Sequence, residues 1–149
     1  MEAKMAVERV ILLVEDNPDE ETLTLRAMQG DKGNAAVAVA RDGVEALNYL
    51  FAADGQMEAR LPRFVILDLK LPRLDGFDVI ARLRADPRTR PLPVVVFSSS
   101  SEVQDVRRCN QLGANSYVVK PVAAEQYREA VSRMVQYWLN LNLDPYVRK

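Results

Sequence analysis

The sequence predicts an α/β protein built on a parallel sheet with helices on both faces. Two observations predict this class. Five short apolar runs, rich in β-branched residues, recur along the 149 residues, and an amphipathic segment follows each run. Strands that alternate with helices in this way form parallel sheets, because each helix returns the chain across one face. A hydrophobic fraction of 48% and a charged fraction of 28% are typical of one globular domain of this length.

The first two strand–helix units have clear boundaries. Residues 10–14 (VILLV) form a continuous apolar run, which predicts a strand buried on both faces. Pro18 is placed to begin a helix, and three carboxylates follow it in the first turn, where the helix dipole favours negative charge. We expect this helix to end near Gly30. A weaker strand follows at 36–40, and Asp42 is expected to cap the next helix.

The remaining units repeat this pattern. The third, fourth and fifth strands are predicted at residues 64–67, 93–97 and 116–119. Asp75 is expected to cap the helix after the third strand, and Gly113 to end a helix that begins near Ser101. The last helix is predicted to begin near Val122. The loop from Gly55 to Pro62 is longer than is usual for an α/β connection.

The composition excludes several kinds of site. The chain has no histidine, so it has no Ser-His-Asp triad, Cys-His dyad or phosphohistidine, and its single cysteine, Cys109, allows no internal disulfide. No glycine-rich nucleotide-binding motif occurs, so we expect no bound ATP or dinucleotide. The net charge of −1 argues against nucleic acid as the main partner. Without a signal peptide or a membrane-spanning run, we expect a soluble cytoplasmic protein.

Reactive side chains follow four of the five predicted strands, at the edge where parallel sheets bind ligands. Glu15 and Asp16 follow the first strand, Asp68 the third, Ser98 the fourth and Lys120 the fifth. Three carboxylates this close together call for a cation, and oxygen ligands favour Mg²⁺. A carboxylate beside Mg²⁺ can attack phosphorus, while a lysine and a hydroxyl stabilise the transferred group. The combination predicts an aspartate that accepts a phosphoryl group.

Over about residues 8–138, this combination resembles the receiver domain of two-component response regulators. The segment Asp68–Pro72 (DLKLP), then Asp75–Gly76 and Lys120–Pro121, add to the likeness. The resemblance implies a flavodoxin-like (CheY-like) fold, a doubly wound five-stranded sheet in the order 2-1-3-4-5. Any one of these residues would be ordinary at a strand end, and it is their combination that is specific.

The resemblance also implies how phosphate is bound. Asp68 would be the phosphoacceptor, and Ser98 and Lys120 would bind the phosphoryl oxygens. Ser98 and Tyr117 would form the conformational switch, in which the hydroxyl moves toward the phosphate and the aromatic ring turns inward. The family usually has Thr at the position of Ser98, and its Lys120–Pro121 bond is usually cis.

A metal site is implied as well. Glu15, Asp16 and Asp68 would hold Mg²⁺ through their carboxylates, and Lys70 would contribute its backbone carbonyl. Glu15 stands where the family more often has Asp, which lengthens one of the arms that bind the metal.

The C-terminal residues suggest a second function. We expect the receiver domain to span 1–138, followed by an arm at 139–149 in which apolar and polar residues alternate. An exposed arm of this kind would be an interaction surface, and we expect it to pack on a second copy in a homodimer. Packing back on its own domain remains the alternative. The residues expected to form the dimer are Tyr137, Trp138, Leu141, Leu143 and Tyr146.

The long loop, the serine run and the aromatic tail together resemble single-domain regulators that are paired with bacteriophytochrome kinases. This likeness implies a light-sensing histidine kinase as phosphodonor. The chain would then relay phosphate to a further phosphotransfer protein, or act as a phosphate sink. We expect no direct DNA or membrane binding, and no enzymatic activity beyond its own phosphoryl transfer and autodephosphorylation.

Three other classes compete with this interpretation. A phosphatase of the haloacid dehalogenase type also uses an aspartyl phosphate, but usually needs a second Asp where this chain has Lys70. A flavodoxin-like cofactor binder needs a phosphate-cradling loop after the first strand, where Glu15 and Asp16 would repel a phosphate. A pseudo-receiver that serves only as a scaffold would not need this intact set of site residues.

Overall fold

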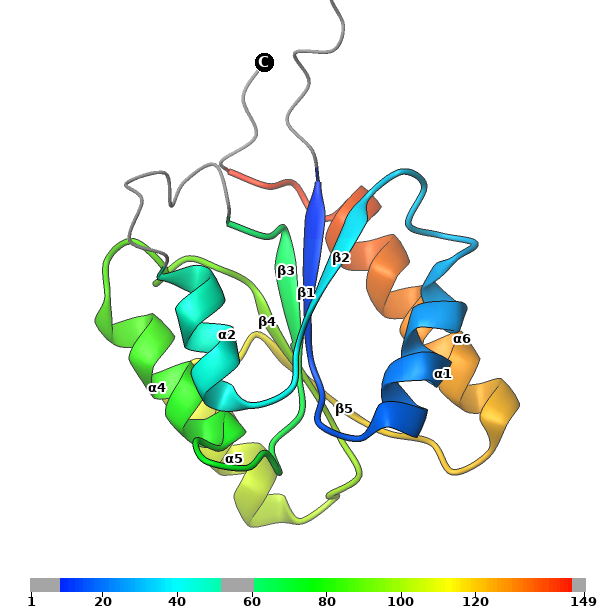
Figure 1. Ribbon diagram of the computed structural model, residues 1–149. Helices are drawn as coiled ribbons and strands as arrows, with labels where there is room; N and C mark the ends of the chain where they lie inside the picture. Colours follow the sequence, from blue (N-terminus) through cyan, green and yellow to red (C-terminus); the bar gives the residue numbers. More distant parts are fainter. Residues whose placement is uncertain (1–8, 52–60, 146–149) are drawn as a thin grey trace, which may run out of the picture.

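The computed structural model describes residues 9–51 and 61–145. Five strands form one parallel sheet in the order β2-β1-β3-β4-β5, which confirms the predicted fold class and strand order (Figure 1). The strands are β1 (Val10–Val14), β2 (Ala36–Ala40), β3 (Phe64–Leu67), β4 (Val94–Ser98) and β5 (Ser116–Val119). All four strand pairs are parallel, so the carboxyl ends of the strands meet at one edge.

The helices cover both faces of the sheet, as predicted. They are α1 (Pro18–Met28), α2 (Gly43–Leu50), α4 (Gly76–Ala85), α5 (Val103–Leu112) and α6 (Ala124–Val135), which continues into the π-helical segment η2 (Gln136–Leu141). Helices α1 and α6 lie together on one face, and α2, α4 and α5 lie on the other (Figure 1). Across residues 9–51 and 61–145, none of the helices has the length and apolar character of a membrane span.

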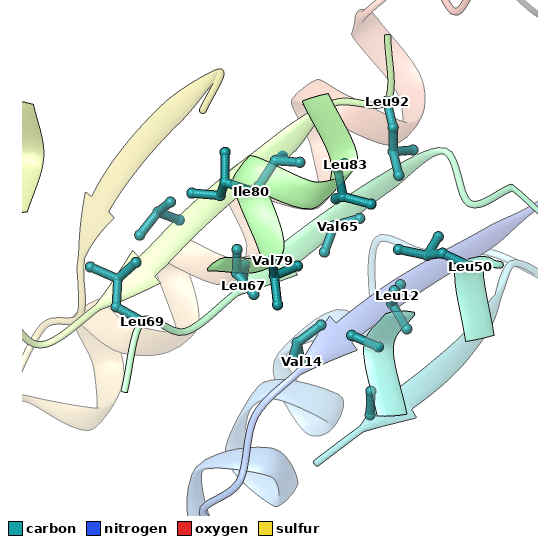
Figure 2. Packing of buried hydrophobic residues seen from close by; sticks show 14 of the residues in the cluster. Leu12, Val14, Leu50, Val65, Leu67, Leu69, Val79, Ile80, Leu83 and Leu92 are labelled. Atoms are coloured by element: carbon teal, nitrogen blue, oxygen red, sulfur yellow. The ribbon is translucent and has the colours of Figure 1, made fainter. Parts of the chain in front are cut away.

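The core is divided in two by the sheet. Side chains alternate along β1, so Leu12 and Val14 face α2 and α4, whereas Ile11 and Leu13 face α1 and α6. Figure 2 shows the first of these clusters, in which side chains of α2 and α4 pack over β1 and β3. Because β1 is buried on both faces, its continuous apolar sequence is required by its central place in the sheet.

Short polar residues begin the helices that lead away from the site. The side chain of Asn17 accepts hydrogen bonds from the backbone N–H groups of Asp19 and Glu20, at 2.9 and 3.1 Å. Asp42 caps α2 and Asp75 caps α4 in the same manner, as predicted. Gly113 ends α5 with a positive φ of 107°, which also agrees with the sequence.

The C-terminal segment differs from its predicted course. The helix does not end at Trp138, because α6 passes into η2 and continues to Leu141. Leu139 lies four residues after Val135 on the same helical face, and both are buried in the core between the sheet, α1 and α6. The predicted alternation starting at residue 139 was therefore the wrong pattern for this stretch.

Two contacts hold the following residues against the same domain. The guanidinium of Arg9 donates to Asn140 at 3.3 Å, and Arg63 pairs with Asp144 at 3.2 Å. The backbone N–H of Asn142 donates to the carbonyl of Tyr137, five residues earlier, as in a π-helix. Residues 139–144 thus fold back on their own domain. Tyr146 lies outside the described residues, as does most of the Gly55–Pro62 loop.

Candidate functional site

Three carboxylates come together at the carboxyl edge of the sheet. Glu15 and Asp16 follow β1, Asp68 follows the neighbouring β3, and one oxygen of each lies within 4.8 Å of the others. Glu15 and Asp68 are buried, whereas Asp16 is exposed. The backbone N–H of Asp68 still donates to the carbonyl of Val14 at 3.1 Å, so the strand pairing fixes their relative positions.

Both oxygens of Asp68 have defined partners. Oδ1 accepts a hydrogen bond from the backbone N–H of Leu69 at 2.7 Å, and Oδ2 accepts one from Nζ of Lys120 at 3.1 Å. Gly76 lies so close behind this turn that a Cβ there would be 2.5 Å from the carbonyl oxygen of Asp68. The side chain of Asp68 is therefore oriented by its neighbours in both sequence and space.

Lys120 is the cation of the cluster. Its Nζ donates to Oε1 of Glu15 at 2.9 Å, to Asp68, and to Oε1 of Glu20. The side chain is only 7% exposed, and its backbone N–H donates to the carbonyl of Ser98 at 2.8 Å. No peptide bond among the described residues is cis, so the Lys120–Pro121 bond is trans, contrary to the family expectation.

Glu20 was not predicted from the sequence as part of the site. The sequence indicates for it only a place among the carboxylates that favour the first turn of α1. The signal was present, however, because the helix begins directly after Asp16 and Asn17 caps it through the N–H of Glu20. A side chain in that first turn can reach back over the strand ends.

The charges in the cluster do not balance. Burial, and then the nearby Asp68 carboxylate, raise the pKa of Glu15 from its usual 4.5 to about 7. Burial alone would lower the pKa of Lys120, but its contacts with Glu20, Asp68 and Glu15 outweigh burial and raise it above its ordinary value. The lysine therefore stays charged and neutralises only part of the surrounding negative charge.

The predicted switch residues are linked through Ser100. Ser98 is buried at the end of β4, and its Oγ accepts a hydrogen bond from the backbone N–H of Ser100 at 3.2 Å. The hydroxyl of Tyr117 donates to the carbonyl of Ser100 at 2.8 Å. The hydroxyl of Ser100 in turn donates to Asp105 on α5 at 2.6 Å. The loop between β4 and α5 thus connects Ser98 to Tyr117 and to α5.

A pocket of about 500 Å³ opens beside the carboxylates. Asp16, Lys70 and Ser98 line it, together with Leu69, Phe77 and Ser100. Asp75 also lies on its wall, but its carboxylate caps α4 through the N–H of Asp78. The structure therefore brings Lys70 and Ser98 to the same cavity as Asp16, between the loops that follow β3 and β4.

The oxygen donors of this edge fit a hard divalent cation. The cluster offers carboxylates from Glu15, Asp16 and Asp68, and Lys70, whose backbone carbonyl the family resemblance implies as a further ligand, lines the adjoining pocket. Neither nitrogen nor sulfur ligands stand among these donors, which is the ligand chemistry of Mg²⁺ or Mn²⁺. The unbalanced negative charge supplies the electrostatic reason for a cation to bind there.

The comparisons with known proteins agree with this geometry. The sequence pattern of the response regulator receiver domain matches residues 11–132, so the chain belongs to this family. The probable methanogenesis regulatory protein FilR2 of Methanothrix harundinacea (strain 6Ac) is 38% identical over 136 residues. These residues cover 91% of this chain and 87% of FilR2.

Among solved structures, the phosphorylated cyanobacterial phytochrome response regulator RcpA has a TM-score of 0.86 at 33% identity, covering 93% of this chain and 99% of RcpA. The Mn²⁺-bound form of response regulator Rcp1, a protein of Synechocystis, has a TM-score of 0.84 at 28% identity, with 92% and 99% covered. The bacteriophytochrome response regulator AtBRR is 43% identical, with a TM-score of 0.68 and coverage of 91% and 99%.

Proposed function

We propose that this chain is a single-domain response regulator that accepts a phosphoryl group on Asp68 from a histidine kinase. The observation that carries the proposal is the setting of Asp68. Its carboxylate ends a central strand, contacts the buried ammonium of Lys120 at 3.1 Å, and lies in a cluster of three carboxylates that fits a divalent cation. Membership of the receiver family supports the same chemistry.

Each residue has a distinct task in this transfer. An oxygen of Asp68 attacks phosphorus, the O–P bond forms as the P–N bond of the donor phosphohistidine breaks, and the electron pair leaves on the imidazole nitrogen. Lys120 and the hydroxyl of Ser98 would contact the phosphoryl oxygens and stabilise their charge. Mg²⁺ held by Glu15, Asp16, Asp68 and the Lys70 carbonyl would reduce the repulsion between the carboxylate of Asp68 and the negative oxygens of the incoming phosphoryl group.

The contacts of Ser100 support the proposed switch. If the Ser98 hydroxyl turned toward a phosphoryl group, it would give up the hydrogen bond that it accepts from the N–H of Ser100. Because the carbonyl of Ser100 holds the Tyr117 hydroxyl, a shift of this loop would also change the position of the ring. The altered surface around α5 and β5 would be the output.

Intact-protein mass spectrometry tests the acceptor. After incubation with acetyl phosphate and Mg²⁺, we expect one added phosphoryl group that is labile to base. Asp68→Asn should show no adduct, and neither should the wild type without a divalent cation. Absence of both a phosphoryl adduct and beryllofluoride binding in the wild type would refute the proposal in favour of the scaffold alternative.

The kinase that we propose is a bacteriophytochrome. The likeness to AtBRR, at 43% identity, and to the phytochrome regulator RcpA supports it. Phosphotransfer from a purified bacteriophytochrome kinase should be rapid and should change between red and far-red light. A kinase without a phytochrome module is the control, and equal transfer from the two kinases would contradict the assignment.

A homodimer is also proposed, formed through the apolar residues that the folded C-terminus leaves exposed. Tyr137, Leu141 and Leu143 are exposed, whereas Trp138 packs partly on its own core. Light scattering should show a dimer that the double change Leu141→Lys with Leu143→Lys dissociates. Leu23→Lys, at an exposed leucine of α1, is the matched control and should leave the dimer intact.

The remaining features of the proposal follow from this function. We place the protein in the cytoplasm, with a downstream phosphotransfer protein as the acceptor of the signal or with the chain as a phosphate sink. It would catalyse only its own phosphoryl transfer and autodephosphorylation, and would contact neither DNA nor membranes directly.

A further inference from the structure

We propose that Glu20 is a positioning residue that competes with the incoming phosphoryl group for the ammonium of Lys120. This inference rests on the proposed phosphorylation of Asp68. In the structure Glu20 is a fourth carboxylate beside the cluster, and it contacts the lysine rather than the other carboxylates. It would thereby set how readily the site takes up a phosphoryl group.

The donors of Lys120 are all engaged. An ammonium group carries three N–H donors. The three partners of Nζ are Glu15 at 2.9 Å, Asp68 at 3.1 Å and Glu20. A phosphoryl oxygen on Asp68 therefore needs one of these contacts to be released before Lys120 can donate to it.

Glu20 is the partner that can leave at the lowest cost. The side chains of Glu15 and Asp68 are buried beneath the sheet edge, and both belong to the group that fits a divalent cation. Glu20 is 35% exposed, so its carboxylate can return to water without an uncompensated buried charge. Release of Glu15 or Asp68 from Lys120 would leave a buried carboxylate without its cation, which carries a large desolvation penalty.

The position of Glu20 also affects the donor molecule. Asn17 fixes the first turn of α1 through the N–H of Glu20, which keeps this carboxylate close to the strand ends. A negative charge there repels an anionic phosphodonor as well as occupying the lysine. Both effects act in the same direction, against phosphoryl binding.

The test compares Glu20→Gln with Glu21→Gln. Glu21 lies on the same turn, carries the same charge and pairs with Arg41 at 3.0 Å, so it is a matched control. The rate of Asp68 phosphorylation is measured against acetyl phosphate concentration at saturating Mg²⁺. For Glu20→Gln we expect the half-saturating concentration to fall about threefold to tenfold, with little change in the maximal rate. Glu21→Gln should remain near the wild type, and Glu20→Ala should act like Glu20→Gln.

A spectroscopic readout separates this role from a general structural effect. The chain has five lysines, so ¹⁵N-lysine labelling resolves the Lys120 ammonium by its loss in Lys120→Arg. Beryllofluoride with Mg²⁺ should shift this signal in the wild type. Glu20→Gln alone should shift it before any beryllofluoride is added, whereas Glu21→Gln should not.

The possible failures are distinguishable. If the wild type takes up phosphoryl groups and the Glu20 variants match Glu21→Gln in both concentration dependence and lysine signal, this inference is overturned and the proposed function stands. If the wild type accepts neither phosphoryl groups nor beryllofluoride, the proposed function fails and this inference fails with it.

Discussion

The side chains at the sheet edge carry more negative charge than Lys120 can neutralise. Glu15, Asp68 and Glu20 contact one ammonium group, Asp16 lies beside Glu15 and Asp68, and two of these four carboxylates are buried. Burial and the neighbouring Asp68 carboxylate raise the pKa of Glu15. In the absence of a metal ion, the protonation of Glu15 therefore contributes to the pH dependence of stability.

Glu15 should make the metal-free protein more stable as the pH falls from about 7 toward 4.5. Its pKa is raised to about 7 in the folded protein from the usual 4.5. Between these values the folded protein binds a proton that the unfolded chain has already released, so a lower pH favours folding. Urea unfolding midpoints in EDTA, at about pH 5 and about pH 7.5, measure the effect.

Glu15→Gln is the control for this prediction, because the amide has no proton to release in this range. Its urea midpoint should depend on pH less steeply than that of the wild type. The same pH dependence in both proteins would show that Glu15 is not the responsible group.

The loop that leaves β3 is fixed by close backbone packing against the start of α4. A Cβ on Gly76 would lie 2.5 Å from the carbonyl oxygen of Asp68 and 2.8 Å from Cα of Leu69. Both contacts are with backbone atoms, so the start of α4 cannot accept a side chain unless the β3–α4 turn moves. That turn carries Asp68 and Lys70, so their position depends on how β3 and the start of α4 pack against each other.

Gly76→Ala should weaken both the fold and the metal site. We expect a loss of about 1–3 kcal/mol in the free energy of unfolding, because the added methyl group displaces backbone. Mg²⁺ affinity, followed by amide shifts in NMR spectra, should fall as well. Gly30→Ala is the control, since a Cβ there meets no atom within 4 Å. Equal Mg²⁺ affinity in the two variants would contradict the prediction.

The burial of Leu139 in η2 should contribute to the stability of the domain. Leu139 is 3% exposed in the core, and Leu143 is 88% exposed. Leu139→Ala should lower the free energy of unfolding by about 2–5 kcal/mol, whereas Leu143→Ala should have almost no effect on a monomer. Denaturant unfolding at low protein concentration measures both. Similar losses for the two changes would mean that the segment does not pack as described.

Across the whole molecule, the carboxylate cluster and the folded C-terminal segment lie at opposite ends of the strands. The carboxyl ends of the strands carry the carboxylates and Lys120. The opposite edge carries η2 and the contacts of Arg9 and Arg63 with residues 140 and 144 (Figure 1). Phosphorylation and the proposed dimer contact would thus occur at different ends of one domain, connected by the sheet and by α6.

Some features of the site and the fold could be predicted from the sequence, and others could not. Strand ends are marked directly in the chain, so the placement of Asp68, Ser98 and Lys120 at one edge follows once the sheet is known to be parallel. The contact of Glu20 with Lys120 depends on the direction in which the first turn of α1 leaves the sheet, and the hydrophobic periodicity of the sequence does not specify this direction. The sequence predicts an arm at Leu139 instead of a helix, because the π-helical turn interrupts the spacing of an α-helix.

Trp138 gives the molecule a natural optical probe. It is the single tryptophan, it lies within η2, and its ring centroid is 4.8 Å from that of Tyr137. Because this position is at the far edge from the carboxylates, Mg²⁺ titration should leave its emission unchanged in a fluorimeter. A spectral change on phosphorylation would then report, without any label, that the signal has travelled the length of the domain.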